Sequence, residues 1–117
     1  MQEFSRIDKI NEQLLQQISI IKQKMHDIRV QEITILKVMS SKDLSKAKVF
    51  FSTLNEDNVV EIEKALNRAA SFFRSELANT TKMRKVPMLR FIFDPCLLEG
   101  QKLHLLISKL NQGKAEQ

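Results

Sequence analysis

The sequence of 117 residues has few glycines and prolines, one cysteine, and neither tryptophan nor tyrosine. The single cysteine, Cys96, excludes a disulfide framework and fits a reducing compartment. Two glycines are too few for a glycine-rich phosphate-binding loop. Because tryptophan and tyrosine are absent, phenylalanine is the only aromatic side chain that could stack on a nucleobase.

Long apolar runs are also missing. No uncharged apolar stretch approaches the roughly 20 residues of a membrane-spanning helix, and residues 1–13 lack the apolar core of a secretory signal. We therefore expect a cytoplasmic protein that does not enter a membrane. The length predicts a single domain over residues 1–117, with residues 111–117 as a frayed tail.

Positive charge is plentiful and is concentrated in one segment. The chain has a formal net charge of +5 and an isoelectric point near 9.5. Residues 64–90 contain seven lysines and arginines against one acid, Glu76, which gives this segment a net charge of +6. The seven are Lys64, Arg68, Arg74, Lys82, Arg84, Lys85 and Arg90. Such a segment indicates a polyanionic partner.

The opening stretch predicts a helix from about Phe4 to His26. Its apolar residues recur every three or four positions, and Ser5 and Asp8 have the spacing of a capping box. The apolar stripe predicts packing on a sheet. A coiled coil is the alternative, since part of the stripe also fits three heptads, although Asn11 would be a costly core residue there.

Two strands are predicted next, the first from Val30 to about Val38 and the second in AKVFFSTL. The serines and the aspartate between them, Ser40 to Ser45, favour a turn, so the strands should be antiparallel neighbours. In the second strand Ala47 begins the apolar face. Lys46 and Lys48 extend the basic segment if they share its face.

The central region predicts two helices that meet at the small residues Ala69, Ala70 and Ser71. The first should start near Asn58, whose spacing from Glu61 fits a capping box. Ser71 is expected to be the N-cap of the second helix, which runs from Phe72, and Asn79 is expected to end it in a left-handed conformation. Phe72 could stack on a base, but burial is the expectation.

A third strand is predicted after Val86-Pro87, with Leu89, Phe91 and Phe93 on one face. The helices form a crossover between the second and third strands, so these strands should be parallel and the sheet order should be one, two, three. A short final helix is expected after Asp94.

The segments RVQEITILKVMSSKDLSKAKVFFS, ALNRAASFFRSELA and MRKVPMLRFIFD together resemble the bacterial ribosome-binding factor A family. The resemblance implies an α+β, KH-like domain of type II with the order α-β-β-α-kink-α-β and a three-stranded sheet covered by helices. It places the family's Ala-x-Gly kink at Ala69, Ala70 and Ser71. Serine therefore stands here where the family has glycine, which favours a capped break over a close backbone approach.

The resemblance also implies a function. Members bind the maturing small (30S) ribosomal subunit and its 16S rRNA and aid processing of the rRNA; no reaction is attributed to them. The sequence agrees, because His26, His104 and Cys96 lack the spacing of a metal site or a nucleophile pair. We therefore expect no catalytic residue, no cofactor and no metal.

The expected interface consists mainly of Arg74, Lys82, Arg84 and Lys85 contacting rRNA phosphates, with Lys64, Arg68 and Arg90 as further contributors. The expected protein is a monomer. Two alternative functions stay open: a stand-alone KH-type module for single-stranded RNA, and a coiled-coil homodimeric scaffold. The sequence also leaves open whether an assembly GTPase acts on the same particle.

Overall fold

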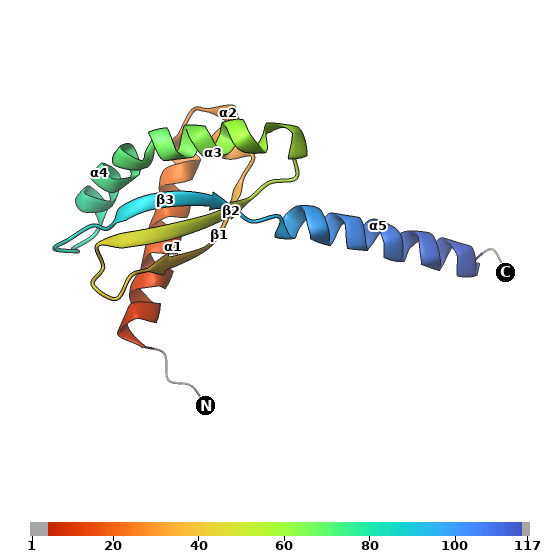
Figure 1. Ribbon diagram of the computed structural model, residues 1–117, viewed down its shortest axis with the longest axis horizontal. Helices are drawn as coiled ribbons and strands as arrows, with labels where there is room; N and C mark the ends of the chain where they lie inside the picture. Colours follow the sequence, from red (N-terminus) through yellow and green to blue (C-terminus); the bar gives the residue numbers. More distant parts are fainter. Residues whose placement is uncertain (1–4, 116–117) are drawn as a thin grey trace.

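The computed structural model describes the backbone of residues 5–115, and the side chains of residues 5–110 apart from residues 28, 56 and 97. It shows a three-stranded sheet with helices packed against one of its faces (Figure 1). The elements in chain order are α1 (Arg6–Lys24), α2 (Ile28–Gln31), β1 (Thr34–Ser40), β2 (Lys46–Ser52), the 3-10 turn η1 (Glu56–Asn58), α3 (Val59–Arg68), α4 (Ala70–Thr80), β3 (Met88–Phe93) and α5 (Cys96–Ala115).

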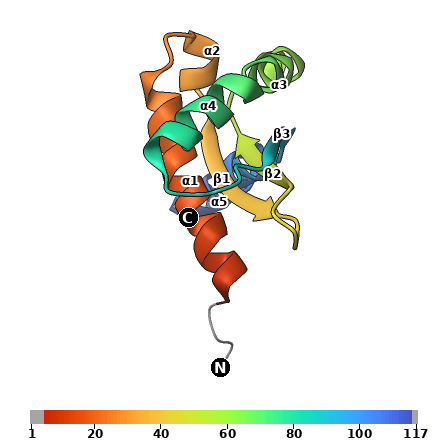
Figure 2. The ribbon, with the colours of Figure 1, turned by 90° about the vertical axis from the view of Figure 1, so that its left-hand side faces the viewer.

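Helix α1 begins with the predicted capping box. The Ser5 hydroxyl accepts a hydrogen bond from the Asp8 N–H, and the Asp8 carboxylate accepts one from the Ser5 N–H, both at 3.1 Å. Leu14, Ile18 and Ile21 are buried in the core, so the predicted packing on the sheet is confirmed (Figure 2). A coiled coil would need this apolar stripe of α1 to be free to pack on a second chain, but the stripe is already buried within its own domain. The predicted start at Phe4 lies outside the described residues, and the helix ends at Lys24, two residues before His26.

The short helix α2 corrects the prediction of a strand from Val30. The Asp27 side chain accepts from the Arg29 N–H at 2.9 Å, and the Asp27 carbonyl accepts from the Val30 N–H at 3.0 Å. These local bonds favour a helical turn over an extended start. Val30 is buried in the core but belongs to this helical turn, and the strand itself begins at Thr34.

Strand β1 contains a bulge between Ile35 and Lys37 in its antiparallel pairing with β2. Because a bulge shifts the alternation by one residue, Ile35 and Val38 both face the core although they are three positions apart. The predicted antiparallel hairpin is confirmed. Its turn is closed by Asp43, whose carboxylate accepts from the hydroxyls of Ser41 and Ser45 at 2.7 and 2.8 Å.

Strand β2 alternates as predicted, with Ala47, Val49 and Phe51 buried. It pairs in parallel with β3, in which Leu89 and Phe91 are buried, and the sheet order is β1-β2-β3. The parallel crossover and the strand order are therefore confirmed. Together with the helices these strands form the α+β, KH-like arrangement expected from the sequence.

The central helices begin and end close to the predicted positions, since α3 starts after Asn58 and α4 ends at Thr80, but their caps differ from those predicted. Asn58 makes no side-chain capping bond and lies in η1, so the capping box with Glu61 is wrong. Asn79 is not left-handed: α4 continues to Thr80, and the N–H and hydroxyl of extended Thr81 both donate to the Leu77 carbonyl, at 2.9 and 2.7 Å. These two bonds satisfy the carbonyl at the helix end without any residue at positive φ.

Side chains from the helices contact both edges of the sheet. On the β3 edge, the Asn67 side chain accepts from the Phe91 N–H at 2.9 Å and donates to the Phe91 carbonyl at 3.1 Å, while Glu63 accepts from the Phe93 N–H at 3.0 Å. On the β1 edge, Asn11 accepts from the Ser40 N–H at 3.0 Å. The residue that would have been costly in a coiled coil is thus a hydrogen-bonded partner of the sheet.

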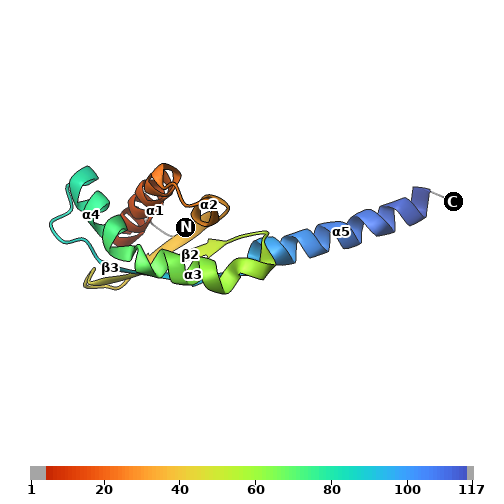
Figure 3. The same ribbon diagram turned by 90° about the horizontal axis from the view of Figure 1, so that it is seen from above.

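Helix α5 is longer than the short helix that was predicted. It has 20 residues, continues to Ala115, and projects away from the sheet (Figures 1 and 3). Leu98 in its first turn is buried, whereas the apolar side chains beyond it are exposed, namely Leu103, Leu105, Leu106, Ile107 and Leu110. None of the helices in residues 5–115 is both long and apolar enough to cross a membrane.

Candidate nucleic-acid interface

The loop between α4 and β3 presents three of the predicted cations to solvent. We call Lys82, Arg84 and Lys85 the basic loop; all three side chains are exposed. Met83 and Val86, which lie between and beside them, are partly buried against the core. The apolar anchors hold the loop while the cations point outward.

The basic loop lies beside the β1–β2 turn. The Met88 N–H donates to the Ser45 carbonyl at 2.9 Å, which joins the end of the loop to the turn. The pKa of Asp43 in this turn is held well below its ordinary value, mainly by hydrogen bonds from the hydroxyls of Ser41 and Ser45. The charge of Lys85 contributes in the same direction. Asp43 is therefore ionised at neutral pH and engaged within its own turn.

Arg74 does not belong to the exposed set. Its side chain is half-buried, and Nη2 donates to the Val86 carbonyl at 3.3 Å. Its Nε is buried and has no hydrogen-bond partner in the described part of the chain. Arg74 therefore ties α4 to the basic loop, and the expectation that it is a principal phosphate contact is not favoured by its position.

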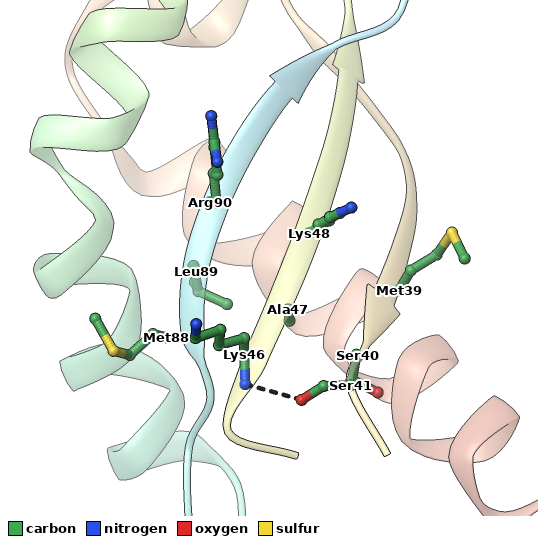
Figure 4. A pocket seen from close by; sticks show the side chains of 9 residues that line it. All are labelled: Met39, Ser40, Ser41, Lys46, Ala47, Lys48, Met88, Leu89 and Arg90. Atoms are coloured by element: carbon green, nitrogen blue, oxygen red, sulfur yellow. Dashed lines mark hydrogen bonds between the residues drawn. The ribbon is translucent and has the colours of Figure 1, made fainter. Parts of the chain in front are cut away.

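Arg90 lies on the face of the sheet that the helices leave open, which we call the open face. Lys48 is its direct partner on β2, and both side chains are exposed (Figure 4). Lys46 lies on the same face beside Met88. Lys46 and Lys48 therefore share a face with Arg90, one of the seven predicted cations.

Lys37 is a further cation on the open face that the sequence did not single out. It pairs with Phe50 across the strands, and its Nζ lies 5.0 Å from the centre of the Phe50 ring. Its face could not be read from alternation, because the bulge after Ile35 reverses the pattern.

Lys64 and Arg68 lie elsewhere. Both are exposed on α3, whose buried residues are Ile62 and Leu66. Residues two positions apart do not share a helix face, so these cations point away from the stripe that packs on the sheet. The seven predicted residues are therefore divided among the basic loop, the open face, the outer side of α3 and the half-buried position of Arg74.

The bend between the central helices lies at Ala69, as the small residues predicted, but not through a serine cap. Ala69 has φ −87° and ψ 3°, and its N–H is shared between the carbonyls of Ala65 and Leu66 at 3.1 Å each. Ser71 is exposed inside α4, and no side chain caps the N-terminus of this helix. The predicted N-cap is wrong.

A glycine is not needed at this bend. Among the described non-glycine residues only Leu44, in the β1–β2 turn, has a positive φ, of 60°. Ser71 takes a helical conformation that any L-residue can adopt. Phe72 is 46% exposed beside the bend, which contradicts its expected burial, whereas Phe73 is fully buried and packs 5.0 Å from the ring of Phe91.

Metal-ligating side chains do not gather in this region. No group of three His, Cys, Asp or Glu residues able to hold a metal ion occurs among the residues that the structure describes.

The sequence profile of the family described as Ribosome-binding factor A matches residues 6–107. The chain belongs to the ribosome-binding factor A family. A curated relative, ribosome-binding factor A of Shewanella baltica, is 42% identical over 119 aligned positions, which cover 98% of this chain and 76% of the relative. The resemblance noted in the sequence is therefore confirmed.

Solved structures of ribosome-binding factor A share the fold. The crystal structure of the Thermus thermophilus protein has a TM-score of 0.69 and 28% identity, covering 74% of this chain and 93% of that chain. A homology model of the Thermus thermophilus protein, fitted into a cryo-EM map of a complex with the 30S subunit, has a TM-score of 0.61 and 28% identity, covering 73% and 91%. The family is thus one of ribosome-binding proteins.

Proposed function

We propose that this chain binds the maturing small ribosomal subunit in the cytoplasm through phosphates of the 16S rRNA, and that it assists processing of this rRNA by binding rather than by catalysis. The observation that carries the proposal is the basic loop. Lys82, Arg84 and Lys85 are exposed on a loop anchored by Met83 and Val86, beside the hairpin turn. Cations held in this way can contact a phosphate ridge without disturbing the sheet.

Support also comes from the relatives. The Thermus thermophilus protein has been fitted into a complex with the 30S subunit, and the present chain has the same fold. We propose that the chain acts as a monomer, because the apolar stripe of α1 is buried within its own domain. An assembly GTPase acting on the same particle is compatible with this proposal.

The test is cosedimentation with isolated small subunits at physiological salt. Replacing Arg84 and Lys85 by glutamate should abolish most of the binding, because two phosphate contacts become repulsive. The melting temperature should change little, since substitutions of exposed charges seldom alter stability by more than about 0.5 kcal/mol.

The matched control reverses two exposed lysines, Lys102 and Lys109, which carry the same charge but belong to α5, the helix that projects away from the sheet (Figure 1). This control should bind nearly as well as the wild type. Cosedimentation of the Arg84→Glu/Lys85→Glu protein at the wild-type level would overturn the proposal.

A further inference from the structure

The open face of the sheet is basic over its whole extent. Four cations project from it, namely Lys37, Lys46, Lys48 and Arg90. The three strands themselves contain no acid: β1 reads TILKVMS, β2 KAKVFFS and β3 MLRFIF. The acids at the strand ends, Asp43 and Asp94, accept hydrogen bonds within their own turns. Nothing within the strands neutralises the four cations.

The cations are arranged in rows across the strands. Met39, Lys48 and Arg90 form one row, because Met39 pairs with Lys48 and Lys48 with Arg90. Neighbouring strands lie about 4.8 Å apart, so Lys48 and Arg90 can approach a single phosphate or two adjacent ones. Arginine favours this contact, since its planar fork binds phosphate in a bidentate manner.

Three of these four cations line an apolar hollow. An open hollow of about 670 Å³ is lined by the residues in Figure 4, among them Lys46, Lys48 and Arg90. Met39 on β1 and Met88 on β3 flank it, and their side chains point to opposite sides. Met39 and Met88 are 52% and 60% exposed. Thioethers are flexible and polarizable, so they can adapt to apolar surfaces of different shapes. The flat face of a nucleobase is one such surface.

The mixture of apolar and cationic side chains distinguishes between forms of RNA. A duplex keeps its bases inside and presents phosphates and sugars, whereas a single strand can place bases against a protein surface. A face for duplex RNA alone would gain little from Met39 and Met88. Met88, which lines the hollow, follows the basic loop in the chain, and its N–H donates to the Ser45 carbonyl of the hairpin.

We propose that the open face binds single-stranded RNA, with Lys46, Lys48 and Arg90 on the phosphates and with Met39 and Met88, at the two sides of the face, each against a different base. The proposal rests on the proposed function in that it takes RNA as the partner. It adds a second contact surface on the opposite side of the sheet from α1 and assigns it a distinct form of RNA.

The test uses the full chain and a fluorescein-labelled oligouridine of twelve nucleotides, with binding followed by anisotropy over a series of KCl concentrations. The variant Lys48→Gln/Arg90→Gln should lower the slope of log affinity against log salt by about 1.4, because each lost phosphate contact on a single strand contributes about 0.7. The variant Met39→Ala/Met88→Ala should weaken binding several-fold at unchanged slope. Lys102→Gln/Lys109→Gln, on α5, is the matched control and should match the wild type.

Three results would overturn the inference. They are a wild-type slope in Lys48→Gln/Arg90→Gln, unchanged affinity in Met39→Ala/Met88→Ala, and tighter wild-type binding to a duplex of equal length. Circular dichroism of each variant establishes that it is folded.

Cosedimentation of the same proteins with small subunits separates the two proposals. Oligouridine binding with the expected slopes but no wild-type cosedimentation would reject the proposed function and keep this inference. Wild-type cosedimentation with small subunits, without the expected changes in oligouridine binding, would reject this inference alone.

Discussion

The link between α3 and the free edge of β3 gives a sharp test of the fold. Asn67 makes two hydrogen bonds to the backbone of Phe91, at 2.9 and 3.1 Å, across 24 residues of chain. Asn67→Ala removes both. Each such bond contributes about 0.5–1.5 kcal/mol, and alanine returns at most about 0.7 kcal/mol through its better helix propensity. The expected net loss is about 0.3–2.3 kcal/mol of unfolding free energy.

Urea denaturation measures this loss, and hydrogen exchange locates it. In Asn67→Ala the Phe91 amide should exchange faster, because its partner is gone. Asn79→Ala is the matched control: Asn79 is exposed on α4 and makes no side-chain hydrogen bond in the described part of the chain, so this change should be neutral or slightly stabilising. If Asn67→Ala is as stable as Asn79→Ala and the Phe91 amide keeps its protection, α3 does not hold the β3 edge.

Three further predictions concern the turn, the bend and the core. Because hydrogen bonds from Ser41 and Ser45 hold the pKa of Asp43 well below its ordinary value of 3.8, this carboxylate stabilises the fold above that value and loses its effect as the pH falls through the folded-state pKa. Asp43→Ala should therefore flatten the loss of stability below about pH 4 in acid denaturation, and an unchanged acid limb would contradict the assignment. Ser71→Ala should alter stability by less than about 0.5 kcal/mol in thermal melts, since Ser71 is exposed and caps nothing. A loss above about 1 kcal/mol would instead indicate that Ser71 is the N-cap of α4. Leu14→Ala should cost about 2–5 kcal/mol because Leu14 is fully buried, and a dimer that dissociates without loss of fold would instead support a coiled coil.

The regular elements could be predicted because their signals are local. The stripe of α1, the alternation of β2 and β3 and the serines of the hairpin each depend on neighbouring residues, and the crossover rule then sets the parallel pairing. Helix ends were less predictable. Several side chains near each end can cap: Thr81 rather than Asn79 closes the end of α4, whereas Asn58 and Ser71 cap nothing.

The candidate site was predictable in composition but not in arrangement. The charge of residues 64–90 identified the basic segment, yet sequence proximity could not show that Arg74 bonds to the Val86 carbonyl. Nor could it show that Lys48 and Arg90, 42 positions apart, are direct neighbours. Lys37 was hidden by the bulge, and the role of Asn67 depends on a contact that no local pattern contains.

The side-chain bonds at the sheet edges limit how an extended partner can dock. A peptide that joins a sheet as an extra strand needs free N–H and C=O groups along an edge. Here Asn67 and Glu63 occupy such groups on β3, and Asn11 occupies one on β1. An extended ligand is therefore directed to lie across the strands rather than alongside them, and crowded copies of the protein have little opportunity to polymerise edge to edge.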